Sequence, residues 1–172
     1  MVFITRHFGR MIVNSGPLFL LYYLSISEID TEFSNIFEIL SFNIQIIIIY
    51  YWMIREASIL GNGHVFFAGI INDVIMGLPL GLSAISYLAV SFVANYVKAV
   101  TVNFSLFTDW FTFLIAIFFS NLVFLLLMLN FSDLEIVYSD IFYNAFFTFL
   151  FFPFFWFIFN LYKNLMVIKK DG

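Results

Sequence analysis

One carboxylate, Asp73, lies within a long apolar stretch of the chain. It follows His64 by nine residues, and at a helical rise of about 1.5 Å per residue this spacing places it roughly 13 Å into a hydrocarbon layer. An ionisable residue at that depth is a candidate functional residue, because an unpaired charge is costly there. The simplest role is a hydrogen bond to the next helix through Tyr87 or Ser91, or to its own turn through Asn72. Docking of a partner protein and proton or ion transport are the alternatives.

No other group of residues in the sequence suggests catalysis. His7 and His64 are the only histidines, neither has a carboxylate at metal-ligand spacing, and the chain contains no cysteine. No serine-nucleophile or phosphate-binding motif is present, and we expect no second buried carboxylate that would share acid–base chemistry with Asp73. The sequence therefore predicts a protein that is not an enzyme and that binds no metal or cofactor.

Glycines and a proline surround the acid at regular intervals. Gly69, Asp73 and Gly77 follow one another at steps of four, so on a helix they share one face, where small residues let a neighbouring backbone approach closely. The acid is therefore expected to face protein and not lipid. Residues 77–81, GLPLG, should end the helix, because Pro79 has no amide donor while Gly77 and Gly81 tolerate positive φ.

The composition identifies the class of protein. Of the 172 residues, 63% are hydrophobic and 10% are charged, whereas soluble domains contain about 25% charged residues. We therefore expect an integral membrane protein formed by a single domain, residues 1–172. The interruptions between apolar runs are short, so any function must reside in the helices and their loops.

Six apolar runs predict an all-α bundle of six transmembrane helices. They cover residues 11–26, 36–54, 64–78, 82–97, 110–129 and 141–161. A helix needs about 20 apolar residues to cross a bilayer, and the first, third and fourth runs are shorter than that. The competing topology has the third and fourth runs entering and leaving on the same side as a re-entrant hairpin.

The charges predict the orientation of this bundle. With six crossings every basic residue falls on one side, namely Arg6, Arg10, Arg55, Lys98, Lys163, Lys169 and Lys170. The positive-inside rule makes that side cytoplasmic, so both termini are predicted to be inside. The opposite loops contain only acidic charges, Glu28, Asp30, Glu32, Asp133, Glu135 and Asp140.

Polar and aromatic residues indicate further contacts. Ser83, Tyr87, Ser91 and Asn95 recur at steps of four and predict an interhelical hydrogen-bonding face. Tyr50, Tyr51 and Trp52 end the second run and Trp110 opens the fifth, which predicts an aromatic belt at the membrane interface. Pro153 should kink the last helix, because its missing N–H removes one hydrogen bond.

Several of these residues together resemble a known family. They are Tyr51-Trp52, then Gly69 and Asp73, then Gly77, Pro79 and Gly81, and finally Asn144, Pro153 and Trp156 in the last run. In this order and spacing they resemble the rod shape-determining protein MreD family. The chain departs from the family pattern at residues 55–57, where a proline is usual, and in the loop near Lys98, which is often more basic.

The resemblance implies a role in bacterial cell-wall elongation and peptidoglycan synthesis. It implies a non-enzymatic scaffold in the inner membrane, required for cell shape, that binds the bitopic protein MreC. Through the wider complex it would reach the MreB filament, the glycosyltransferase RodA and its transpeptidase. The residues expected to have structural or partner-docking roles are Asp73, Gly69, Gly77, Pro79, Gly81, Trp52, Tyr87, Asn144 and Pro153.

Two other classes of membrane protein match the size of the chain. A small solute-binding subunit of a vitamin transporter would have a polar-lined pocket facing outward and an alanine-rich first helix. The run 11–26 shows only Asn14, Ser15 and Gly16 as small or polar residues of note. A channel or respiratory-complex subunit would have further buried charges.

Overall fold

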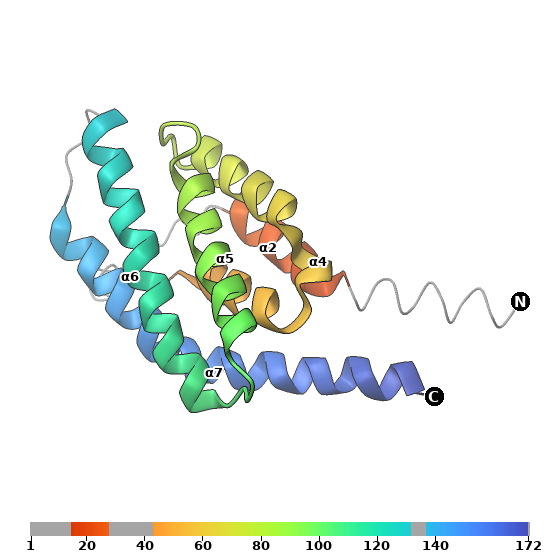
Figure 1. The fold of residues 1–172 in the computed structure, drawn as a ribbon. Coiled ribbons are helices and arrows are strands. Elements are labelled where there is room, and N and C mark those ends of the chain that lie inside the picture. The colour runs from red at the N-terminus through yellow and green to blue at the C-terminus, as the bar shows by residue number, and fades with distance from the viewer. Residues whose placement is uncertain (1–14, 28–42, 132–136, 172) are drawn as a thin grey trace, which may run out of the picture.

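The computed structural model describes residues 15–27, 43–131 and 137–171. Within these ranges the chain forms five α-helices and no strand: α2 (Gly16–Ile26), α4 (Ile44–Ile75), α5 (Leu82–Val100), α6 (Leu106–Phe131) and α7 (Tyr138–Asp171) (Figure 1). The prediction of an all-α protein is confirmed. The beginnings of the predicted helices 11–26 and 36–54 lie outside the described residues.

Four of the described helices are long and apolar enough to cross a membrane: α4, α5, α6, and α7 as far as Asn164. The remaining helix, α2, is apolar but spans only 11 residues. The chain is therefore a multi-pass membrane protein. A count of four does not support the prediction of six spans or the orientation of the termini derived from it.

Helix α4 folds back on itself. Glu56 and Gly61 have non-helical backbone angles, and the Gln45 side-chain amide donates a hydrogen bond to Asn72 at 3.1 Å. In a straight helix the 27 residues between these two positions would separate them by roughly 40 Å. The first half of α4 (residues 44–55) and its second half (residues 62–75) therefore lie side by side. They correspond to the predicted runs 36–54 and 64–78, with the turn where the sequence predicts a loop.

The first half of α4 forms the centre of the bundle. Every residue from 46 to 54 is buried, as expected for a helix that is apolar on all sides. Helix α5 packs most extensively against α4, α2 packs on α4, and α6 packs on α5. Figure 1 shows α5 between α6 on one side and α4 with α2 on the other, with α7 crossing below them.

The helix ends differ from the predictions by several residues. The second half of α4 ends at Ile75 and not at residue 78, α5 continues to Val100, and α6 begins at Leu106 and not at residue 110. Helix α7 contains Pro153 near its midpoint and changes direction along its length (Figure 1), in agreement with the predicted kink.

Candidate functional site

Asp73 holds the turn between α4 and α5. Its side chain is fully buried, and its two carboxylate oxygens accept hydrogen bonds from the backbone N–H groups of Gly81 (2.8 Å) and Ser83 (2.7 Å). The first N–H groups of a helix have no partner within the helix. Because Gly81 is the N-cap of α5 and has no side chain to accept them, the carboxylate of Asp73 does so from the preceding helix.

The partners of Asp73 therefore differ from the predicted ones. The prediction that the acid faces protein is confirmed, but the side chains of Tyr87, Ser91 and Asn72 do not bind it. Tyr87 donates to Gln45 (2.9 Å) and Ser91 to Asn62 (2.6 Å). Helical spacing correctly indicated the neighbouring helix, but it did not reveal that the turn brings the backbone amides of α5 closer than these side chains.

The glycines around Asp73 have two separate functions in the backbone. Gly77 and Gly81 have φ angles of 64° and 99°, which confirms the predicted positive φ at both ends of the turn. Gly69 instead provides space, because a Cβ atom placed on it would lie 2.3 Å from Cα of Ala84 in α5. Within this turn, the Leu82 N–H donates to the Pro79 carbonyl at 3.2 Å.

We expect Gly69→Ala to lower the free energy of unfolding by about 1–3 kcal/mol, because the added methyl group must separate α4 from the backbone of α5. The matched control is Gly63→Ala in the same helix, where a Cβ would meet nothing within 4 Å and alanine favours the helix. Unfolding in detergent would be measured for both variants. Equal stabilities would contradict the close contact at Gly69.

We expect Gly81→Val to be destabilising for a different reason. A Cβ here would have space, with its nearest neighbour, Cδ1 of Ile85, at 3.9 Å. The positive φ alone should cost about 1–3 kcal/mol. Gly63→Val is the control for the β-branched side chain, and thermal stability of both variants in detergent is the measurement. A Gly81→Val variant as stable as this control would show that the turn does not require positive φ.

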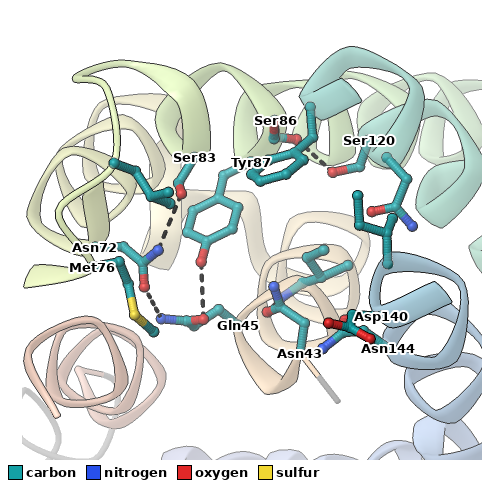
Figure 2. A pocket seen from close by; sticks show the side chains of 15 residues that line it. Asn43, Gln45, Asn72, Met76, Ser83, Ser86, Tyr87, Ser120, Asp140 and Asn144 are labelled. Atoms are coloured by element: carbon teal, nitrogen blue, oxygen red, sulfur yellow. Dashed lines mark hydrogen bonds between the residues drawn. The ribbon is translucent and has the colours of Figure 1, made fainter. Parts of the chain in front are cut away.

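A chain of polar side chains joins the two halves of α4 to α5. Tyr87 donates to Gln45 (2.9 Å), Gln45 donates to Asn72 (3.1 Å), and Asn72 donates to Ser83 (3.1 Å) (Figure 2). Together with the Ser91–Asn62 bond, these contacts confirm the predicted hydrogen-bonding face of α5 at three of its four positions. These hydrogen bonds hold the side chains of Tyr87, Gln45, Asn72 and Ser83 in fixed orientations.

Beside these hydrogen-bonded side chains lies a cavity of about 440 Å³ between α4, α5, α6 and α7. Its amide side chains are Asn43, Gln45, Asn72, Asn121 and Asn144, and its hydroxyl groups belong to Ser83, Ser86, Tyr87 and Ser120. Its apolar side chains are Ile46, Met76, Leu78, Phe124 and Ile141, and its one charged group is Asp140. Figure 2 shows Asp140 and Asn144 of α7 across the cavity from Tyr87 and Asn72.

A second buried carboxylate forms a cluster that the sequence analysis missed. Asp109, at 3% side-chain exposure, pairs with Arg55, at 11%, and also accepts a hydrogen bond from the Trp156 indole (2.8 Å). The Arg55 guanidinium carbon lies 5.0 Å from the Phe104 ring centre and 5.6 Å from that of Tyr51. This cluster joins the end of the first half of α4 to α6 and α7.

The cluster corrects two predictions. Arg55, predicted to lie between the runs 36–54 and 64–78, is part of α4 and is paired with Asp109, and Asp73 is not the one deeply buried acid. Asp109 was missed because the predicted helix began after it, at residue 110. The overlooked signal is Ser105, whose hydroxyl accepts a hydrogen bond from the Thr108 N–H at 3.2 Å, as a helix N-cap does. A helix begun there includes Asp109 in its first turn.

The aromatic-belt prediction was wrong for the residues at the end of the first half of α4. Tyr50, Tyr51 and Trp52 are at most 1% exposed, because this half is surrounded by other helices. Trp110 has a specific partner, since its indole donates to the Phe149 carbonyl at 2.9 Å. That carbonyl lies four residues before Pro153, which has no N–H to donate to it.

The residues of α7 that carry the family resemblance thus lie at three different contacts. Asn144 lines the cavity, and the Trp156 indole donates a hydrogen bond to Asp109. Pro153 has no N–H for the Phe149 carbonyl, which accepts a hydrogen bond from Trp110 instead. The other predicted site residues Tyr87 and Trp52 are buried within the bundle.

Comparison with protein-family models, with curated proteins and with solved structures finds no match to the chain.

Proposed function

We propose that the protein is a non-enzymatic scaffold of the bacterial cell-wall elongation machinery in the inner membrane, and that it binds an MreC-like partner with a single transmembrane helix. One observation supports this proposal. Over an apolar stretch of 18 residues in each helix, 56% of the residues are buried in α4 and in α5, whereas 28% are buried in α6 and 11% in α7. Fewer residues of α7 than of α4 or α5 are therefore covered by the rest of the described protein, and its exposed side chains can contact lipid or another helix.

Six large exposed side chains of α7 recur along one side of the helix. They are Phe142, Phe146, Leu150, Phe154, Phe157 and Leu161, between 49% and 68% exposed. Their spacing of three or four residues places them on the same side of the helix. We call this set the outer face of α7. Van der Waals packing contributes to helix association in membranes, and these large side chains would provide contact area to a partner helix.

The proposal is tested by the double variant Phe146→Ala/Phe154→Ala on the outer face of α7. We expect loss of co-purification of an MreC-like partner and loss of rod-shape rescue in a depleted strain, with normal abundance in the membrane. The matched control is Phe92→Ala/Phe118→Ala, which truncates two comparably exposed rings on α5 and α6. Equal partner recovery from both variants would reject α7 as the docking helix.

We further propose six crossings with both termini in the cytoplasm. The fold-back of α4 supports this, because its two halves lie side by side and correspond to the predicted runs 36–54 and 64–78. Reporter fusions that are active only outside the cytoplasm should be silent at Arg6 and Lys169 and active near Asp30 and Asp133. A reporter that is active at Lys169 would exclude the arrangement.

A solute-binding subunit of a vitamin transporter is the second candidate function, favoured by the polar cavity. Its lining includes Asp140, which belongs to the acidic loops predicted to face outward. Cells that express the protein with an energising partner should then accumulate a solute, and substitutions in the cavity should abolish this uptake. A channel or respiratory-complex subunit was predicted to have further buried charges. Arg55 and Asp109 are such charges, but they form an ion pair and neutralise each other.

A further inference from the structure

We infer that the cavity between α4, α5, α6 and α7 binds a small uncharged molecule with an apolar ring and an amide-like edge. The inference deepens the second candidate function and rests on it for any role in transport. The cavity volume of about 440 Å³ lies within the range of roughly 300–1,000 Å³ that small-molecule sites occupy.

The wall of the cavity offers no positive charge to an anion and only one exposed carboxylate, Asp140, to a cation. Its polar lining consists of neutral amides and hydroxyls, with no lysine, arginine or histidine to balance an anion. The one carboxylate, Asp140, is exposed in the first turn of α7, where the helix dipole already stabilises it. A buried anionic ligand would therefore lose its hydration without gaining a partner.

Part of the wall is pre-organised for hydrogen bonding. Gln45 and Asn72 each use one hydrogen of the side-chain NH₂ group within the polar chain, and each group has a second hydrogen. Because both side chains are held by their neighbours, a ligand would not have to immobilise them, which lowers the entropic cost of binding.

Asn121 distinguishes a binding site from simple interhelical contact. Among the residues that the structure describes, its half-buried side chain has no hydrogen-bond partner, although it lines the cavity from α6. A polar residue that served only to join helices would be paired across the interface. Phe124, one helical turn away on the same side of α6, provides an apolar surface for a ring.

The test measures binding of three probes of matched size to the full-length protein in lipid nanodiscs: benzamide, benzoate and benzylammonium. We expect benzamide to bind with a dissociation constant about tenfold or more below those of the two charged probes. Asn121→Leu should raise the benzamide dissociation constant about fivefold by removing one hydrogen-bonding group. The control, Asn130→Leu, alters an exposed asparagine of α6 outside the cavity and should leave binding unchanged.

The result that overturns the inference is equal binding of all three probes, tighter binding of a charged probe, no detectable binding, or unchanged benzamide binding in Asn121→Leu. Asn121→Ala, which also removes the amide, replaces the leucine variant if that protein is not recovered folded. Benzamide binding without solute uptake in cells would support the site and reject the transport function. Loss of co-purification of the MreC-like partner would bear on the proposed scaffold function and not on this binding site.

Discussion

Replacing Asp73 with leucine is expected to lower the free energy of unfolding by about 1–3 kcal/mol for the buried one of two amide donors that lose their acceptor, and by less for the part-buried one. These donors are the backbone N–H groups of Gly81 and Ser83 at the start of α5. Their loss would loosen the turn that holds α5 against the second half of α4. Unfolding in detergent and abundance in the membrane are the measurements.

Asp73→Asn separates hydrogen bonding from charge. An asparagine retains one acceptor oxygen but presents an NH₂ group to the other amide donor, so its stability should lie between wild type and the leucine variant. Glu56→Leu is the control for losing an exposed carboxylate. Wild-type stability of Asp73→Leu would contradict the capping role. Loss of shape rescue by Asp73→Asn at normal abundance, with the partner retained, would instead indicate a charged or proton-exchanging role.

Replacing Arg55 with leucine is expected to destabilise the protein by about 3–5 kcal/mol, because the buried carboxylate of Asp109 then has no opposite charge. The indole of Trp156 still donates to it, but one neutral donor does not replace a guanidinium. The variant should show a lower melting temperature in detergent and lower abundance in the membrane.

The double variant Arg55→Leu/Asp109→Leu tests the reason for this effect. Replacing both partners of a buried ion pair by apolar residues is often nearly neutral, so we expect the double variant to be more stable than Arg55→Leu. Lys98→Leu is the control, since Lys98 is exposed and forms no ion pair among the described residues. A double variant less stable than Arg55→Leu would show that Asp109 stabilises the protein without Arg55, through the hydrogen bond that it accepts from Trp156.

Local features of the sequence predicted local features of the structure. The positive φ angles at Gly77 and Gly81 and the polar face of α5 depend on residues within a few positions of one another. Backbone preferences and helical periodicity act over that range, so the chain itself specifies them. The close contact of α5 at Gly69 was also predictable from the sequence, because small residues at steps of four mark such helix contacts in membranes.

Contacts between distant residues were not predictable in the same way. Arg55 and Asp109 are separated by 54 positions, and each has the sequence context of a residue at the end of a helix. Likewise, Trp52 resembles an interface residue until the fold-back of α4 places it inside the bundle. Burial depends on which helices surround a residue, and the periodicity of one helix does not contain that information.

The sequence by itself determined that this is a helical membrane protein, where its central turn lies, and that Asp73 faces protein. The tertiary structure alone decided what Asp73 binds, that Arg55 and Asp109 pair, and that polar side chains from four helices surround a cavity. The physical reason is the range of the forces involved. Apolar content and backbone preference are properties of a segment, whereas a hydrogen-bond partner for a buried polar group is determined by the packing of the whole bundle.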